Sequence, residues 1–274
     1  PILGISIINI CRAGFGGPQR GAVMDLGLKG KRVIVTGGSK GIGRATALTF
    51  AEEGADVAIC ARGADALEVT RKEIAALGVS AFAQSCDVGD PAALTEFLEA
   101  ARAALGGVDI LINNTSGFGL GDDESGWETS LQVDLMGSVR ASWAVVPWME
   151  EAGGGAIVHI SSTSGMEAGS PPAYAAVKAA LISHSKTMAN QLAPSGIRVN
   201  CVAPGSIEFP GGLWEQIKES NPQYYESMRT SIPFGRLGTD TEVASAVVFI
   251  ASPRASWVAG ANLPVDGVQH KGNL

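Results

Sequence analysis

The chain has 274 residues, and its 27 Asp and Glu against 20 Lys and Arg give a formal net charge of −7. Hydrophobic residues make up 46% and charged residues 17%, a composition that excludes an intrinsically disordered chain. The acidic balance argues against nucleic acid and anionic membrane surfaces, which attract clustered basic charge. No apolar run approaches the ~20 residues that span a bilayer. We therefore expect a globular protein that binds neither nucleic acid nor membrane.

The first 23 residues differ in composition from the rest. Arg12 and Arg20 are their only charges, and a glycine-rich stretch leads to Met24, just before the first strand pattern. The segment lacks the basic start and the cleavage site of a signal peptide. We interpret residues 1–23 as an appended or flexible leader, and residues 24–274 as one domain.

The cysteines indicate a reducing environment and no metal site. No C-x-x-C pair occurs, and no histidine stands at ligand spacing from a cysteine, which excludes the common zinc and thioredoxin-like patterns. Three of the four fall at or near strand patterns, so we interpret them as reduced core residues of a cytoplasmic protein. The four are Cys11, Cys60, Cys86 and Cys201.

Strand and helix patterns alternate along the domain. Short apolar runs predict strands at Lys31–Thr36, Asp56–Ala61, Val79–Ser85, Val108–Asn113, Gly155–Ser161, Ile197–Val202 and Ser256–Val265. Helical spacing predicts helices at Gly41–Glu53, Ala64–Leu77, Pro91 to about Leu105, Ser125–Glu151, Tyr174–Leu192 and Thr239–Ala251. Such alternation predicts an α/β fold, a single doubly wound (Rossmann) domain whose parallel sheet is flanked by helices.

One segment does not fit this alternation. Ser206–Gly238 shows no clear period and is too long for an ordinary connection. Loops of this length are usually lids or binding segments, so we predict an irregular substrate loop at about 206–238.

The sequence TGGSKGIG at 36–43 follows the first strand and opens the first helix. Glycine there lets the backbone turn tightly and approach a pyrophosphate, which is then stabilised by the positive end of the helix. Strand, turn, helix and second strand follow at βαβ spacing, which favours a dinucleotide site over a simple tight turn. The expected cofactor-binding residues are Gly37, Ser39, Lys40, Gly41, Ile42 and Gly43.

The end of the second strand indicates which dinucleotide is bound. NAD sites often place an acid there to bind the ribose 2′-hydroxyl, but this strand ends Cys60-Ala61-Arg62. Arg62 together with Lys40 suits the additional 2′-phosphate of NADP. We therefore predict NADP as the cofactor, with NAD as the alternative.

Tyr174 and Lys178 lie four residues apart on a predicted helix and so share a face. Free tyrosine has a pKa of ~10, so acid–base work near neutrality requires a nearby positive charge, which Lys178 supplies. Ser162 follows the preceding strand, at the edge where doubly wound sheets bind ligands, and can hydrogen-bond a substrate oxygen. A Y-x-x-x-K pair alone arises often by chance, so the pattern needs its context.

That context is a series of motifs in a fixed order. TGGSKGIG at 36–43, CDV at 86–88, NN at 113–114, ISS at 160–162, YAAVK at 174–178 and VNCVAPG at 199–205 follow one another. Together they resemble the short-chain dehydrogenase/reductase family over essentially all of residues 24–274. The resemblance implies a seven-stranded sheet, a nicotinamide cofactor and hydride transfer at a carbonyl or alcohol carbon. It also implies a homotetramer packed through the long helices and the last strand.

The resemblance also implies roles for individual residues. Ser162, Tyr174 and Lys178 match the catalytic triad, and Tyr174 and Lys178 also contact the cofactor. Five further positions match residues that line the cofactor site, namely Asp87, Val88, Asn113, Pro204 and Gly205.

Asp134 is the most consequential departure from the family pattern. The family usually has an asparagine in this place of the long helix, where it holds a water that leads to the lysine. Asp134, in LQVDLMG, can also hold a water, but a carboxylate near Lys178 alters the proton relay. We include Asp134 among the expected catalytic residues.

The substrate loop carries several aromatic residues. They predict a ketone or alcohol with an apolar body, although packing of the loop on the domain explains them equally well. The residues are Phe209, Trp214, Tyr224, Tyr225 and Phe234, and Phe118 is expected to face the same cleft.

Two alternative functions remain. One is a 3-oxoacyl-(acyl-carrier-protein) reductase, which offers basic residues at the cleft rim to an acidic carrier, whereas this chain has Glu150, Glu151 and Ser195 in the corresponding region. The other is a non-catalytic NADP-binding regulatory protein, which should lack the tyrosine or the lysine. A small-molecule ketone or alcohol is the substrate that we expect.

Overall fold

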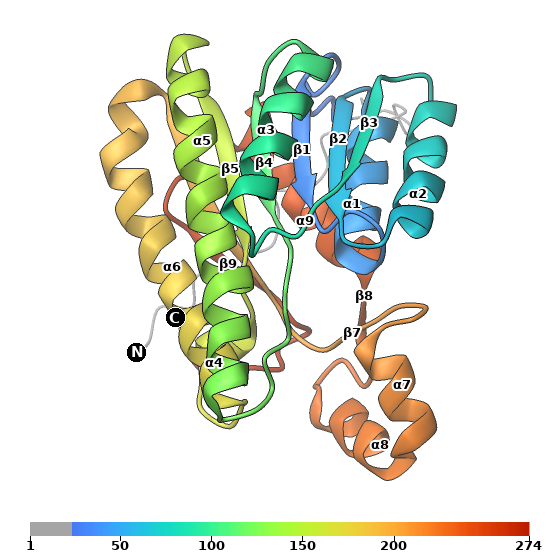
Figure 1. Cartoon of the computed structure of the whole chain (residues 1–274). Helices are drawn as coiled ribbons and strands as arrows, with labels where there is room; N and C mark the ends of the chain where they lie inside the picture. The colour runs from blue at the N-terminus through green and yellow to red at the C-terminus, as the bar shows by residue number, and fades with distance from the viewer. Residues whose placement is uncertain (1–23, 274) are drawn as a thin grey trace, which may run out of the picture.

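The computed structural model describes residues 24–273, so the expected leader at 1–23 lies outside the described residues. A seven-stranded parallel sheet runs in the order β3-β2-β1-β4-β5-β6-β9 (Figure 1). Its strands are β1 (Arg32–Thr36), β2 (Asp56–Ala61), β3 (Ala81–Ser85), β4 (Ile110–Asn113), β5 (Gly155–Ile160), β6 (Ile197–Pro204) and β9 (Asn262–Val265). This arrangement confirms the predicted doubly wound α/β fold.

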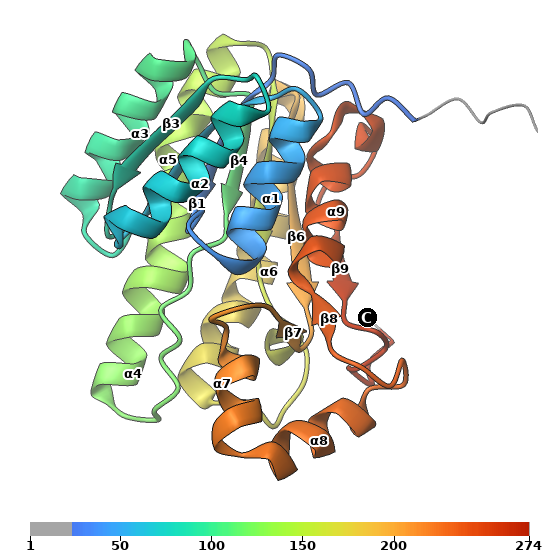
Figure 2. The same cartoon turned by 90° about the vertical axis from the view of Figure 1, so that its right-hand side faces the viewer.

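Helices cover both faces of the sheet, as Figures 1 and 2 show. One face carries α1 (Gly41–Glu52), α2 (Ala64–Ala76) and α9 (Asp240–Ala251). The other carries α3 (Pro91–Leu105), α5 (Gly137–Glu151) and α6 (Pro172–Leu192). Because both faces are covered, the strands read as nearly continuous apolar runs, which is why their positions were predictable.

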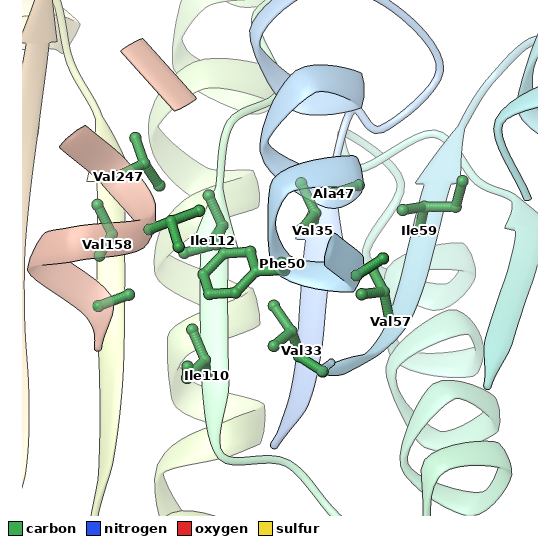
Figure 3. Close-up of a cluster of buried hydrophobic side chains, with 14 of the residues drawn as sticks. Val33, Val35, Ala47, Phe50, Val57, Ile59, Ile110, Ile112, Val158 and Val247 are labelled. Carbon is green, nitrogen blue, oxygen red and sulfur yellow. The ribbon is translucent and has the colours of Figure 1, made fainter. Parts of the chain in front are cut away.

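The core between the sheet and its first helical layer is shown in Figure 3. Phe50 of α1 is fully buried among valine and isoleucine side chains of β1, β2 and β4, and Val247 of α9 lies on the same side. Full burial of each such side chain contributes about 1.5–3 kcal/mol. This packing fixes the carboxyl ends of the strands, where the site lies.

The prediction of an irregular segment at Ser206–Gly238 is wrong. The segment contains α7 (Leu213–Ser220) and α8 (Pro222–Ser231), flanked by short paired strands β7 (Ile207–Glu208) and β8 (Gly238–Thr239). Figure 2 shows the two helices projecting below the main body, and we call residues 206–238 the lid. Both helices are short and mostly polar, but the helical spacing of Leu213, Trp214 and Ile217 in α7 was a signal available in the sequence.

Other boundaries agree with the sequence to within two residues, except at the last strand. That strand begins at Asn262 and not at Ser256, because Gly260 adopts a left-handed backbone with φ of +68° just before it.

The long helix predicted at Ser125–Glu151 also differs in detail. It consists of α4 (Glu124–Thr129), a π-helical segment (Ser130–Met136) and α5. π-helical segments of this kind occur frequently at functional sites, and this one contains Asp134.

Within residues 24–273, no helix is both long and apolar enough to cross a membrane. The same residues contain no cluster of three or more His, Cys, Asp or Glu side chains that could hold a metal ion. Cys60, Cys86 and Cys201 are buried free thiols, and Cys11 lies outside the described residues.

Candidate active site

A cleft of about 750 Å³ opens at the carboxyl ends of the strands. β1 and β4 are neighbours there, and the chain leaves them toward opposite sides of the sheet, the point at which doubly wound folds bind ligands. The lid forms one wall. The expected site residues that line this cleft are Gly37, Ser39, Lys40, Ile42, Gly43, Arg62, Asp87, Val88, Ser162, Tyr174, Lys178, Pro204 and Gly205.

The glycine-rich turn packs so tightly at Gly43 that no side chain fits there. A Cβ on Gly43 would lie 2.1 Å from the carbonyl oxygen of Gly37. Asn114 clamps the same turn, since its Nδ2 donates to the carbonyl oxygens of Thr36 at 3.0 Å and Gly37 at 3.1 Å. The role of Asn114 was missed from sequence, although its position directly after β4, beside β1, was an available signal.

Substituting Gly43→Ala should therefore distort the turn. We expect a loss of about 1–3 kcal/mol in the free energy of unfolding, because backbone atoms must move to accept the methyl group. Weaker dinucleotide binding should accompany it. Gly63→Ala is the matched control, since Gly63 also lines the cleft but a Cβ there meets nothing within 4 Å. Urea unfolding of both variants checks this, and equal stabilities would contradict the turn's assignment.

Two expected cofactor residues do not line the cleft. Asn113 is buried on the opposite face of β4, where its Nδ2 donates to the Ser138 carbonyl and to Ser142 Oγ, both at 3.3 Å. Successive side chains of a strand point to opposite faces, so Asn114 and not Asn113 reaches the site. Gly41 is covered by the ring of Phe209, which a Cβ on Gly41 would approach to 2.5 Å.

Two basic side chains stand at the rim of the cleft. Lys40 and Arg62 are both exposed and line it, and neither forms an ion pair with any residue in 24–273. No acidic residue ends β2, and the one acidic residue of the described chain that lines the cleft is Asp87, after β3. A phosphate bound in the cleft near the end of β2 would therefore lie beside two cations that have no ion-pair partner in the described chain.

Ser162, Tyr174 and Lys178 meet on the other side of the cleft. Lys178 Nζ lies 5.4 Å from the centroid of the Tyr174 ring and donates to the Ile160 carbonyl at 3.0 Å. Ser162 Oγ accepts from the Ser164 amide at 3.1 Å, which leaves its own hydroxyl hydrogen available. The spacing of Tyr174 and Lys178 on α6 places both on the face directed to β5 and the cleft.

Asp134 is adjacent to the catalytic group but does not line the cleft. Its Oδ1 lies 3.1 Å from Lys178 Nζ, and both side chains are buried. The carboxylate that the sequence led us to expect near Lys178 contacts the lysine directly. Asp134 reaches the reacting region only through Lys178, and its membership of the catalytic group stays a prediction.

The predicted aromatic residues divide into two groups. Phe118, Phe209 and Trp214 line the cleft. The others do not line it. Tyr225 is buried in the small apolar cluster of the lid, Phe234 is exposed, and Tyr224 stacks on Trp214 with ring centroids 5.9 Å apart. The apolar wall of the cleft is thus made by three of the six predicted residues.

The three residues expected at the cleft rim are elsewhere. Glu150 and Glu151 end α5 just before β5 begins, so they lie at the amino ends of the strands (Figure 1). The cleft lies at the opposite, carboxyl ends. Ser195 Oγ donates a hydrogen bond to Glu150 Oε1 at 2.9 Å at the same amino ends of the strands. We expected these three residues at the cleft rim, where a carrier-binding reductase has basic residues, and that placement is wrong.

The cleft suits a nicotinamide dinucleotide. Gly37 and Gly43 of the turn have no room for a Cβ, and the two rim cations lack ion-pair partners in the described chain. A serine, a tyrosine and a buried lysine stand at its other end. These features, on a doubly wound sheet, define an NAD(P)-dependent oxidoreductase.

The chain belongs to the short-chain dehydrogenase/reductase family. A family described as enoyl-(acyl carrier protein) reductase matches residues 37–268. Isoepoxydon dehydrogenase of Penicillium expansum is 38% identical over 260 residues, covering 91% of this chain and 98% of that protein. 3-Oxoacyl-[acyl-carrier-protein] reductase of Staphylococcus aureus is 35% identical, with 86% and 97% covered.

Solved structures agree with this membership. L-Sorbose reductase from Gluconobacter frateurii, complexed with NADPH and L-sorbose, is 32% identical with a TM-score of 0.82 and covers 91% of this chain and 100% of its own. A 7α-hydroxysteroid dehydrogenase complexed with NADH is 35% identical with a TM-score of 0.83 and covers 89% and 96%. Relatives of this chain therefore include NADPH and NADH complexes.

Proposed function

We propose that this protein interconverts a free small-molecule ketone and its secondary alcohol with NADP(H). The observation that carries the proposal is one cleft in which Ser162, Tyr174 and Lys178 lie opposite a glycine-rich turn. That turn is flanked by Lys40 and Arg62, which form no ion pair within residues 24–273. A non-catalytic regulatory protein would not need all three residues of the first group.

The chain's own residues supply binding and proton transfer, and the nicotinamide dinucleotide supplies or accepts the hydride. The Ser162 hydroxyl donates a hydrogen bond to the substrate oxygen. The Tyr174 hydroxyl gives its proton to that oxygen during reduction and takes it back during oxidation. The Lys178 ammonium stabilises the phenolate that results. Phe118, Phe209 and Trp214 exclude water from the apolar part of the substrate.

Arg62 is proposed to select NADP(H). Arg62→Ala should raise the dissociation constant of NADPH by about tenfold, the loss of one charge-assisted contact, and should leave that of NADH within about twofold. Arg71→Ala is a matched control, since it removes the same charge from α2 outside the cleft. Fluorescence titration of both coenzymes measures the change. Equal weakening for NADPH and NADH would show that Arg62 does not contact the 2′-phosphate.

Lid charges favour a free substrate over a carrier-bound one. The lid contains three basic residues, and each is paired with an acid, in Lys218–Glu208, Arg229–Glu226 and Arg236–Glu242. The lid therefore offers no spare positive charge to an acidic carrier protein. The resemblance to 3-oxoacyl-[acyl-carrier-protein] reductase keeps that activity as the second candidate.

The substrate assignment is tested by following NADPH consumption with free ketones, β-keto esters, acyl-CoA thioesters and carrier-bound thioesters. We expect turnover with free ketones. Much faster reduction of a carrier-bound thioester than of the matching free or CoA-linked ketone would establish the second candidate instead.

We also propose a cytoplasmic homotetramer. Buried free thiols at Cys60, Cys86 and Cys201 support a reducing compartment. Trp143 on α5 and Trp257 before β9 are 63% and 98% exposed, in the regions through which the family resemblance predicts subunit contact. Burial of these two indole rings in a subunit contact would remove apolar surface from water.

A further inference from the structure

Asp134 connects the catalytic lysine to the segment that follows β4. Lys178 Nζ lies 3.1 Å from Asp134 Oδ1, with the two side chains 2% and 0% exposed. The same carboxylate accepts hydrogen bonds from Ser116 Oγ at 2.6 Å and from the Gly117 amide at 2.9 Å. We infer that Asp134 is a positioning residue that ties Lys178 to the 116–118 turn. Its carboxylate also competes with the Tyr174 phenolate for the positive charge of the Lys178 ammonium, and we call this competition the charge division.

The 116–118 turn carries an aromatic ring against the catalytic tyrosine. Phe118 stacks on Tyr174 with ring centroids 5.9 Å apart and an interplanar angle of 13°. The backbone of Phe118 has φ of +49°, a left-handed conformation that is unfavourable for phenylalanine and persists only where surrounding contacts enforce it. Those contacts include the Ser116 hydroxyl, which accepts from the Phe118 amide at 3.4 Å and donates to Asp134.

One carboxylate thus fixes two neighbours of Tyr174, the ammonium and the stacked ring. The π-helical segment makes this possible, because Asp134 lies within it and is fully buried there. An asparagine at this position has one acceptor oxygen, so it could accept from only one of the two donors in the turn, and it would not neutralise Lys178.

The charge division can be measured because other groups near Lys178 stay neutral. Burial lowers the pKa of His159 to about 3, and burial also lowers the pKa of His184. Burial raises the pKa of Cys201 to about 12. Burial lowers the pKa of Lys178, but attraction to Asp134 and Tyr174 outweighs that effect and the pKa is raised. The titratable groups that face this lysine and its surroundings are Asp134, Tyr174, His159, His184 and Cys201.

Between neutral pH and the pKa of Cys201, both imidazoles are therefore uncharged and the thiol is protonated. The charged partners left to the lysine are Asp134 and the phenolate of Tyr174. Removing the carboxylate leaves the full ammonium charge to stabilise that phenolate.

The test needs no substrate, although the inference rests on the proposed function for the role of Tyr174. The protein has three tyrosines, so tyrosinate absorbance titrated in the full chain and in Tyr174→Phe gives the ionisation of Tyr174 by difference. The same difference is measured with Asp134→Asn present in both proteins. We expect Tyr174 to ionise at a pH about one unit lower when Asp134 is replaced. Superimposable difference curves would overturn the inference.

Ser116→Ala tests the hydrogen bond from the turn to Asp134 separately from the ion pair between Asp134 and Lys178. It keeps the ion pair, so the Tyr174 ionisation should stay in place, while the KM of the substrate should rise by about fivefold as the turn loosens. A shift of the ionisation as large as that of Asp134→Asn would contradict the charge division. Asp134→Ser repeats the titration if Asp134→Asn unfolds early. Separated difference curves in a protein that turns over no ketone would leave the inference standing and reject the proposed function.

Discussion

Replacing Tyr174 by phenylalanine should lower turnover by about 10³-fold while NADPH still binds. The substitution removes only the hydroxyl, so the ring keeps its stack with Phe118 and its place 5.4 Å from Lys178 Nζ. No other acid in the described cleft is placed to replace it, since Asp87 lies beside the second and third strands, away from Ser162. Steady-state turnover and NADPH titration on the same protein separate catalysis from binding.

Tyr224→Phe provides the matched control for this change. Tyr224 belongs to the lid, lies outside the cleft lining, and its hydroxyl makes no hydrogen bond within residues 24–273. We expect its activity to stay within about twofold of the parent, because no interaction is lost. If Tyr174→Phe retained comparable turnover, Tyr174 would not be the proton donor.

Lys178→Met should both abolish activity and destabilise the protein by about 3–5 kcal/mol. The substitution leaves the Asp134 carboxylate buried without its countercharge, and hydrogen bonds from Ser116 and Gly117 replace only part of the ion pair. Uncompensated buried charge is among the few causes of such large effects. Urea unfolding of the coenzyme-free protein measures the loss.

The double substitution Lys178→Met with Asp134→Leu distinguishes this cause from poor packing. Removing both charges should recover most of the stability, because replacing a buried ion pair by apolar groups is often nearly neutral. Activity should not return, since the ammonium is still absent. A double variant no more stable than Lys178→Met would show that the ion pair is not the source of the loss.

The strands, their order of appearance and the glycine-rich turn could be predicted because each has a local signal. A strand buried on both faces is apolar at nearly every position, as in Val33–Val35 at the centre of the sheet. The lid helices had no such signal. They are only 8 and 10 residues long, and they pack on each other through Trp214 and Ile217 of α7 and Tyr225 of α8, with Ile232 and Leu237 from the segment that follows.

Errors in the site came from side-chain direction, which a motif does not specify. Asn113 and Asn114 are adjacent in sequence, yet strand geometry sends only Asn114 to the turn. A carboxylate near Lys178 was expected at Asp134, but the sequence did not specify the direct contact that the π-helical segment gives it. Glu150 and Glu151 were assigned to the cleft rim, whereas they end the 15-residue helix α5 and lie at the amino ends of the strands, away from the cleft. Each outcome depends on three-dimensional placement and not on residue type.

Transfer of deuterium tests the central claim most directly. NADPH deuterated at the transferable position of its nicotinamide ring is incubated with the wild-type protein and a free ketone that it consumes, and the alcohol is analysed by mass spectrometry. We predict one deuterium on the carbinol carbon, formed about 10³-fold more slowly by Tyr174→Phe. An alcohol without deuterium, or labelling at an unchanged rate in the variant, would contradict hydride transfer with Tyr174 as the acid.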